Sequence, residues 1–502
     1  MRLFGAERFS DGSRKIFWLM GLPLYYKKQG HGEKRLYLFG FVPVLSRHDD
    51  GFVVRTRVLG IRMDKKSRDS YRQSVGVDLA SVAEIAGDMR IILDRMPFDY
   101  WDEAENDIPR KNKIRVLFEG SGMVFGGKRG IGGYCRGLLC EMAKYDDIEI
   151  DVIFKNDVNI GKDVLLPKNV RVVKWADFER FSQAYDFMFF GYPGEYILLD
   201  VISNPQKLSK IRSLVGIIHD FIPQLFPMAE IKCNNATQEV LREILFYARK
   251  LDHVFANSEN TRADCMKIAE RLPRDITVIM GGADKEWSKA PSAARLRNDD
   301  IIAGLGGHRR KNVLRTVEAF AMARASGKIP KKARLVITSY LEGNSDMVTE
   351  IEEMLIAYPK CKIGKQVVLP KQFLSTASII RLTGNARAAI YPSLYEGLGM
   401  PVLEAYTVGT PCIGSNNSSV AEIIAPECRF DPRDVRDMSD KIIEIYNSGR
   451  LREISMKFGK KLITKTCNWK IAAAKTVKTL RRLKADMAQG PAVEAPRVAA
   501  KK

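Results

Sequence analysis

Long apolar runs are missing from this sequence of 502 residues. No stretch of about 18 uninterrupted apolar residues occurs, so the sequence predicts no membrane-spanning helix. The N-terminal segment, which includes Arg2, Glu7, Arg8 and Asp11, lacks the apolar core of a secretory signal peptide. We therefore expect a cytoplasmic protein.

Motifs for metals, cofactors and disulfides are also missing. The eight cysteines are scattered, and none forms a Cys-x-x-Cys pair or has a histidine at zinc-ligand spacing. No Asp-x-Asp motif stands at the end of an expected strand, and no cluster of histidine and cysteine suggests a cofactor. We therefore expect reduced, mostly buried thiols, no cofactor, and chemistry without a metal ion.

The middle of the chain has little net charge, although the whole sequence carries +21. Residues 1–66 hold 14 Lys or Arg against 6 Asp or Glu, a net +8, and residues 450–502 hold 15 against 3, a net +12, which leaves +1 elsewhere. A nucleic-acid enzyme usually lines its catalytic groove with cations, so we expect no nucleic-acid partner. Basic ends suit an anionic membrane surface at its cytoplasmic side, the alternative being simple solubility.

A threefold repeat of aromatic and β-branched residues fills residues 1–66, with glycines at 21, 40 and 60. Such segments, separated by polar connectors, favour short strands and predict a small β-rich appendage. Exposed aromatic residues such as Trp18 would rest on a membrane or a partner enzyme, the alternative being a role in packing.

Two series of alternating strands and helices follow. A helical connector and linker over residues 67–112 leads into the first series, residues 113–284, and then into the second, residues 285–489. Alternation of this kind is typical of doubly wound parallel sheets, so we expect an α/β protein with two Rossmann-like domains that face a cleft. Residues 490–502, rich in Pro, Ala and Lys, are expected to be disordered.

The expected strands of the first series are 114–118, 148–154, 170–173, 187–190, 215–218, 254–256 and 277–279. Those of the second series are 301–305, 335–338, 367–369, 388–391 and 412–414.

Two glutamates, Glu396 and Glu404, flank a glycine-rich turn after the expected strand 388–391. Pro401 is well placed to open a helix that Gly409 closes, so the turn joins a strand to a helix and Glu404 should lie in the first helical turn.

This turn has the geometry of an anion-binding site. The free N–H groups at the start of the helix point outward, and Gly397 and Gly399 carry no side chain to keep phosphates away. A carboxylate at Glu404 could accept hydrogen bonds from sugar hydroxyls. The alternative is that both glutamates are solvated carboxylates beside a loop.

The string Glu-Gly-Leu-Gly-Met-Pro-Val-Leu-Glu-Ala, residues 396–405, resembles the Glu-x7-Glu signature of the retaining, family 4 glycosyltransferases of GT-B fold. The resemblance implies that Glu404 holds the ribose of the donor nucleotide and that Glu396 lies beside the donor hexose. It also implies that the chain crosses back to the first domain in its final helices, from Asp434 onward. The residues assigned to donor binding between the two glutamates are Gly397, Leu398, Gly399 and Met400.

A basic cluster, residues 308–312, follows the expected strand 301–305 and precedes an amphipathic helix. A departing nucleoside diphosphate gains negative charge, which a fixed cation stabilises most in the transition state. Arg310 and Lys311 are the candidates, and they resemble the Arg-Lys-Asn block of the same family. The alternative is a basic surface turn.

This cluster departs from the family in one respect. Many members have an arginine five or six residues before the lysine, where this chain has Gly306 and Leu305. Arg310 or Arg309 would then substitute for it.

The first domain contributes a His-Asp pair, His219 and Asp220, at the end of an expected strand. The string around it resembles the loop of family members that transfer mannose, in which the histidine approaches the donor hexose; the alternative is a satisfied structural histidine. The first domain also has a glycine-rich loop at residues 126–134. It is not a dinucleotide fingerprint, because the position of the third glycine is occupied by Cys135. By resemblance, Gly132 and Gly133 in this loop lie near the phosphates and the acceptor.

Ser419 and Glu422 fit a capping box, in which Ser419 is the N-cap and Glu422 returns the bond. We interpret this pair as structural.

These motifs predict a metal-independent, retaining hexosyltransferase that uses a nucleoside diphosphate sugar, with GDP-mannose as the preferred donor. The acceptor would be a hydroxyl of a bacterial surface glycan, lipid-linked or free. By resemblance, the leaving diphosphate helps to deprotonate the acceptor, so no covalent nucleophile is needed. The alternatives are a nucleotide-sugar epimerase of the same fold and a noncatalytic membrane assembly protein.

Overall fold

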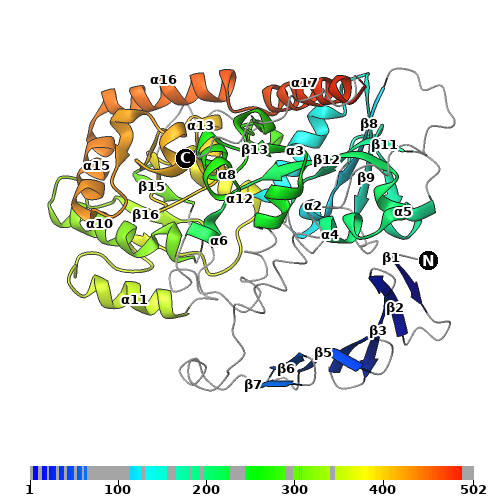
Figure 1. Ribbon diagram of the computed structural model, residues 1–502. Coiled ribbons are helices and arrows are strands. Elements are labelled where there is room, and N and C mark those ends of the chain that lie inside the picture. The colour runs from blue at the N-terminus through cyan, green and yellow to red at the C-terminus, as the bar shows by residue number, and fades with distance from the viewer. Residues whose placement is uncertain are drawn as a thin grey trace, which may run out of the picture. The chain divides into compact units, whose positions relative to one another are not determined.

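The protein is described by a computed structural model (Figure 1). The connector expected at 67–112 and the tail expected at 490–502 lie outside the described residues and stay predictions. The described parts are seven strands within residues 4–64 and residues 113–125, 130–154, 166–180, 184–192, 197–225, 244–288, 298–304, 306, 308–339 and 345–488.

Two compact units make up the chain, and the first contains residues 1–107 and 201–209. Its N-terminal part is a seven-stranded antiparallel sheet in chain order, so the predicted β-rich appendage is confirmed. The three repeat glycines fall between strands and, like the side chain of Trp18, lie outside the described part. The strands are β1 (Phe4–Arg8), β2 (Arg14–Leu19), β3 (Leu22–Gln29), β4 (Glu33–Leu38), β5 (Val42–Asp49), β6 (Val54–Val58) and β7 (Ile61–Asp64).

The second unit begins with a seven-stranded parallel sheet. Its strands are β8 (Ile114–Glu119), β9 (Ile148–Phe154), β10 (Arg171–Lys174), β11 (Tyr185–Phe190), β12 (Ile211–Ile218), β13 (His253–Ala256) and β14 (Ile276–Val278). Every residue of β8 and β11 is buried, as expected for central strands covered on both faces. The order β10-β9-β8-β11-β12-β13-β14 changes direction between β8 and β11, and that switch point is where ligands bind in such sheets.

A second parallel sheet has six strands in the order β17-β16-β15-β18-β19-β20. They are β15 (Asp300–Ala303), β16 (Arg334–Ile337), β17 (Val367–Val368), β18 (Ala388–Tyr391), β19 (Cys412–Ser415) and β20 (Arg429–Phe430). The switch point lies between β15 and β18. The prediction of two doubly wound, Rossmann-like sheets is confirmed, and β20, two residues long, is a strand that the sequence analysis does not predict.

Helices alternate with these strands along the chain (Figure 1). With the first parallel sheet come α2 (Ser121–Phe125), α3 (Ile131–Met142), α4 (Ile197–Ile202), α5 (Pro205–Leu208), α6 (Ile222–Leu225), α8 (Glu259–Ile268) and α9 (Lys285–Ser288). With the second come α10 (Val313–Ala325), α11 (Ser345–Leu355), α12 (Thr376–Asn385), α13 (Met400–Thr407), α14 (Ser418–Ile423), α15 (Val435–Asn447), α16 (Gly449–Lys465) and α17 (Trp469–Ala488).

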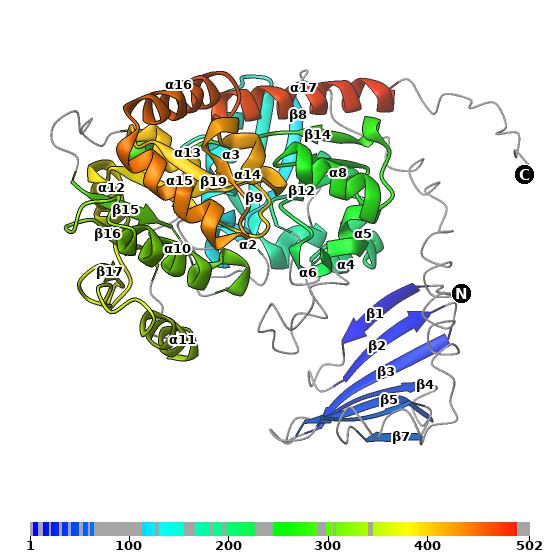
Figure 2. The same cartoon turned by 90° about the vertical axis from the view of Figure 1, so that its left-hand side faces the viewer.

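The last helix, α17, packs against the first parallel sheet. The Oγ1 atoms of Thr479 and Thr277 lie 3.2 Å apart, and Trp469 Nε1 donates to the Ala283 carbonyl at 3.2 Å. The chain therefore crosses back from the second sheet to the first, and both views show α16 and α17 along one edge (Figure 2).

Seven cysteines lie in the described part, where none forms a disulfide and all but Cys140 are buried. In the same part, no helix combines the length and apolar character needed to cross a membrane.

Candidate active site

The switch point of the second sheet brings the predicted cations and Glu396 together. Arg310 and Lys311 stand in a short 3-10 turn after β15, and Glu396 stands in the turn after the neighbouring strand β18. Arg310 Nη1 donates to Glu396 Oε1 at 2.7 Å, and Lys311 Nζ donates to the same oxygen at 2.6 Å. Glu396 is therefore a buried carboxylate with two cations on one oxygen, rather than a solvated loop residue.

The charges in this cluster hold one another in the ionised state. Burial by itself would raise the pKa of Glu396, but the attraction of Lys311 and Arg310 outweighs it and lowers that pKa. Burial opposes the charge of Lys311, yet its pKa is raised because of Glu396. The cations are thus fixed and charged before a ligand arrives, which is what electrostatic stabilisation of a leaving group requires.

Of the two neighbouring arginines, only Arg310 joins this cluster. Arg309 points to Glu350 on α11, with Nη1 donating at 2.7 Å to an oxygen of that half-exposed carboxylate. A Cβ at Gly306 would meet no atom of the described residues within 4 Å. Arg310, and not Arg309, is therefore the arginine that contacts Glu396.

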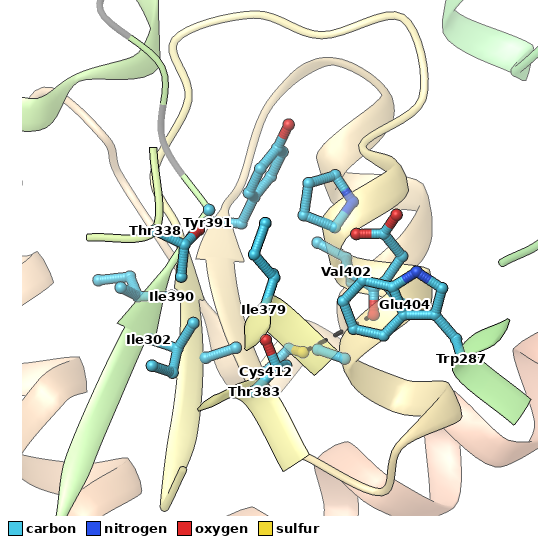
Figure 3. A pocket seen from close by; sticks show the side chains of 14 residues that line it. Trp287, Ile302, Thr338, Ile379, Thr383, Ile390, Tyr391, Val402, Glu404 and Cys412 are labelled. Atoms are coloured by element: carbon cyan, nitrogen blue, oxygen red, sulfur yellow. Dashed lines mark hydrogen bonds between the residues drawn. The ribbon is translucent and has the colours of Figure 1, made fainter. Parts of the chain in front are cut away.

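A narrow pocket next to the cluster contains Glu404. Tyr391 connects the two, because its hydroxyl accepts a hydrogen bond from Lys311 Nζ at 3.1 Å while its ring lines the pocket. Glu404 is buried, and its carboxylate lies beside the indole of Trp287 (Figure 3). Gly304 and Thr338, which directly follow β15 and β16, also line the pocket.

The helix that carries Glu404 begins earlier than its sequence predicts. Gly399, with φ of 94°, is the N-cap and α13 starts at Met400, so Glu404 is its fifth residue. The expectation that Glu404 lies in the first helical turn is wrong. Gly409 does follow the helix in a left-handed conformation, with φ of 80°, as expected for the residue that ends it.

The first parallel sheet contributes His219 at the end of β12. A carbonyl can only accept, so His219 Nε2–H donates to the Gly191 carbonyl at 2.9 Å. Burial lowers the pKa of His219 to about 4, against the opposing effect of Gly191, so the ring is neutral at pH 7 and Nδ1 carries no proton. His219 Nδ1 can therefore accept a hydrogen bond from a hydroxyl group, but the ring is not a cation.

Two close contacts join His219 to the turn at Gly397 and to Tyr134. A Cβ at Gly397 would overlap the His219 carbonyl, so this turn can approach only because position 397 has no side chain. On its other side the His219 ring packs edge-on against Tyr134, with centroids 5.3 Å apart. Gly132 and Gly133 are buried in the first turn of α3, directly before Tyr134.

Asp220 lies within electrostatic range of the cation cluster. Its Oδ1 accepts the N–H of Ile222 at 3.1 Å. Burial raises the pKa of Asp220, and Arg310 is the strongest opposing influence. Asp220 and Glu396 are therefore both under the electrostatic influence of Arg310 and Lys311.

The predicted capping box is wrong. Asn417 is the N-cap of α14, which starts at Ser418, and the carboxylate of Glu422 accepts backbone N–H groups of α8 instead. Ser419 Oγ donates to the Glu396 carbonyl at 2.8 Å. The spacing Ser-x-x-Glu matched the motif, but the motif describes one helix and these side chains bond to other segments.

Sequence reasoning also missed Tyr391 and Tyr395. Tyr391 was assigned to a buried strand, and its place as the last residue of β18 at the switch point was the signal that could have identified it. Tyr395 offered no signal besides its place next to Glu396.

Residues 302–462, which contain most of the second sheet and its helices, match the family described as Glycosyl transferases group 1. The chain is 26% identical over 235 residues to the MMP alpha-(1->4)-mannosyltransferase of Mycolicibacterium hassiacum, covering 46% of this chain and 54% of that protein. It is 23% identical over 235 residues to the serotype-specific mannosyltransferase WbdA of Escherichia coli, covering 45% of this chain and 28% of WbdA. The chain thus spans about half of the first relative and less of the second.

Solved structures share the fold. HepE of Anabaena, in complex with UDP and glucose, superposes with a TM-score of 0.55 at 16% identity, covering 74% of this chain and all of HepE. Sucrose-phosphate synthase of Thermosynechococcus elongatus gives a TM-score of 0.56, also at 16% identity, over 74% of this chain and all of that chain. The two parallel sheets therefore have the GT-B arrangement.

Proposed function

We propose that this chain is a retaining glycosyltransferase that moves a hexose from a nucleoside diphosphate sugar to a hydroxyl of a glycan or lipid-linked glycan in bacterial surface polysaccharide synthesis. The observation that carries the proposal is the cluster in which Arg310 and Lys311 share one oxygen of buried Glu396, beside the pocket of Glu404. The group 1 domain over residues 302–462 supports the same activity.

The cation cluster suits the departure of a nucleoside diphosphate. As the glycosidic bond breaks, negative charge grows on the diphosphate, and cations that are already fixed stabilise it without reorganisation. Before the donor binds, Glu396 neutralises part of the charge of Arg310 and Lys311. The diphosphate would then bind to these cations where Glu396 already holds them, with the carboxylate beside the hexose.

Glu404 would bind the ribose hydroxyls, since its buried carboxylate lines the pocket at the carboxyl ends of the strands. His219, neutral at pH 7, would accept a hydrogen bond from a hydroxyl of the hexose. The glycines at 132 and 133 would leave room for the phosphates or the acceptor. We expect the leaving diphosphate to take the acceptor proton, so that neither a covalent nucleophile nor a metal or cofactor is required.

GDP-mannose is the donor that we prefer. The names of the relatives from M. hassiacum and E. coli describe mannosyltransferases, and the His-Asp loop at 219 resembles that of mannose-transferring proteins.

A thermal-shift panel of GDP-, UDP- and dTDP-sugars tests the proposal. A donor at 100 times its Kd should stabilise the protein by about 2.7 kcal/mol, and a sugar nucleotide that does not bind should have no effect. Product analysis with and without a glycan acceptor then separates transfer from epimerisation. A protein that neither binds nor hydrolyses any nucleotide sugar would instead support the noncatalytic alternative.

The basic C-terminal end offers a surface for an anionic membrane. Lys457, Lys461 and Lys465 are exposed and stand four residues apart on α16, so they share one face, and Lys470 and Lys478 are exposed on α17. Each Lys near anionic headgroups contributes about 1 kcal/mol of attraction. We propose that this face, together with the basic N-terminal end, holds the protein at the cytoplasmic surface of a membrane.

Cosedimentation with vesicles tests this surface. The full chain should bind vesicles that contain phosphatidylglycerol and not those of phosphatidylcholine alone, and replacing Lys457, Lys461 and Lys465 with Glu should weaken binding at least fivefold. The matched control replaces three exposed lysines elsewhere with Glu, namely Lys360, Lys362 and Lys365. Equal losses in both triple variants would contradict a specific surface.

A further inference from the structure

Glu422 on α14 caps a helix of the first parallel sheet. Its two carboxylate oxygens accept the N–H groups of Glu259 at 3.0 Å and Asn260 at 2.7 Å, the first two residues of α8. The next N–H, of Thr261, donates to Ser258 Oγ at 3.0 Å. A carboxylate at a helix N-terminus satisfies N–H groups that have no partner within the helix and also interacts favourably with the helix dipole.

A second connection reaches the same helix from Tyr395. Its hydroxyl donates to Asp264 Oδ2 at 2.7 Å and accepts a hydrogen bond from Asn260 Nδ2, also at 2.7 Å. Asp264 lies on the face of α8 that carries Asn260, four residues away, so the phenol bridges one turn of the helix. Tyr395 directly precedes Glu396 in the chain.

Glu396 itself is held by the helix that carries Glu422. Its N–H donates to Ser418 Oγ at 3.2 Å, and its carbonyl accepts from Ser419 Oγ at 2.8 Å. Ser418 has φ of 47°, a conformation that a non-glycine residue rarely adopts and that the surrounding contacts must maintain. The backbone of Glu396 thus depends on the start of α14, and α14 is fixed to α8 through Glu422.

We propose that Glu422 and Tyr395 are positioning residues for Glu396. Glu422 attaches α14 to α8, Tyr395 attaches the turn after β18 to α8, and together they hold Glu396 in place. The inference rests on the proposed function only for its catalytic consequence; the attachment itself is a property of the fold. Two features distinguish it from general packing. The two residues contact α8 from different segments. Both segments also fix the backbone of Glu396, one through Ser418 and Ser419 and the other because Tyr395 directly precedes it.

Glu422→Gln and Tyr395→Phe test the inference with minimal change of shape. Gln has only one acceptor oxygen, so one N–H of α8 loses its partner, and Phe removes the hydroxyl alone. The matched control is Glu427→Gln, an exposed carboxylate of the same segment. Hydrogen exchange, followed by mass spectrometry of the full chain, should become faster in the peptide that contains Glu396 in both test variants and stay unchanged in the control.

The kinetic measurement uses the donor that stabilises the wild-type protein most in the thermal-shift panel. We expect both test variants to lower kcat on the order of tenfold while the donor Kd stays within twofold, because a misplaced Glu396 affects the reaction more than donor binding. A purely structural role would change the Tm without this division between kcat and Kd.

The two readouts separate failure of this inference from failure of the proposed function. If the wild type binds no nucleotide sugar, the proposed function fails, but exchange at Glu396 still decides whether Glu422 and Tyr395 position it. Unchanged exchange at Glu396 in both variants would overturn the inference, as would an unchanged kcat in an active enzyme. If Glu422→Gln does not fold, Tyr395→Phe decides alone.

Discussion

At the scale of single residues, the candidate site depends on which arginine meets Glu396. The adjacent arginines 309 and 310 are indistinguishable in the sequence, yet one pairs with Glu350 on the surface and the other with buried Glu396. Residue types and spacing predicted Arg310, Lys311 and Glu396 as a group. They could not predict that all three bond through one oxygen, because that depends on side-chain directions in two separate loops.

Replacing Lys311 with Ala should lower kcat about 10²- to 10³-fold, as expected when one group that stabilises transition-state charge is removed. Arg310→Ala should act in the same direction. Steady-state transfer kinetics measure the effect.

The matched control is Arg309→Ala, which removes an equal charge one residue away and should leave kcat within twofold. If all three variants had the same activity, the cluster at Glu396 would have no role in departure of the diphosphate.

At the scale of elements, strands were easier to predict than helix starts and caps. The strand 388–391 was predicted with its observed bounds, since a buried apolar run between polar turns defines it. The start of α13 was missed by one residue, and the carboxylate of Glu422 was expected to bond within its own helix rather than to α8. The first error is within the usual uncertainty of a helix boundary. The second concerns a bond with a distant segment, which local sequence patterns do not contain.

Gly399→Ala should lower the free energy of unfolding by about 1–2 kcal/mol, because an L-residue with φ of 94° is strained. The new Cβ would also lie 2.9 Å from Ile423 Cδ1. Urea denaturation measures the change.

Gly449→Ala serves as the control. This residue starts α16, and a Cβ there would meet only the Arg452 guanidinium, at 3.9 Å, so the variant should be as stable as the wild type or slightly more stable. Equal losses in both variants would contradict the proposed strain at Gly399.

At the scale of the whole molecule, the two parallel sheets followed from the alternation of strands and helices. The contacts between the two sheets and their helices did not follow from this alternation. The attachment of α14 to α8 joins residues more than 160 positions apart, and nothing in either segment identifies the other as its partner. Acid stability is also a property of the whole molecule, because it reflects every buried group that must ionise on unfolding.

His253 gives a pH prediction whose sign is defined. Burial lowers its pKa to about 4, whereas in the unfolded chain it returns to about 6.5, so its contribution to stability is complete above pH 6.5 and is lost as pH falls towards 4. The loss amounts to up to about 3 kcal/mol. Urea denaturation between pH 7 and pH 4.5 should therefore show a smaller loss of stability for His253→Gln than for the wild type, and parallel curves would contradict the assignment.

Titration calorimetry of Glu404→Ala tests the central claim most directly. The titrant is the nucleoside diphosphate that stabilises the wild-type protein most. Loss of a buried carboxylate that accepts hydrogen bonds from the ribose should cost about 1.5–3 kcal/mol, roughly a ten- to hundredfold weaker Kd. Glu427→Ala should bind as the wild type does. If Glu404→Ala kept the full affinity of the wild type, the pocket beside Glu396 would not be the donor site.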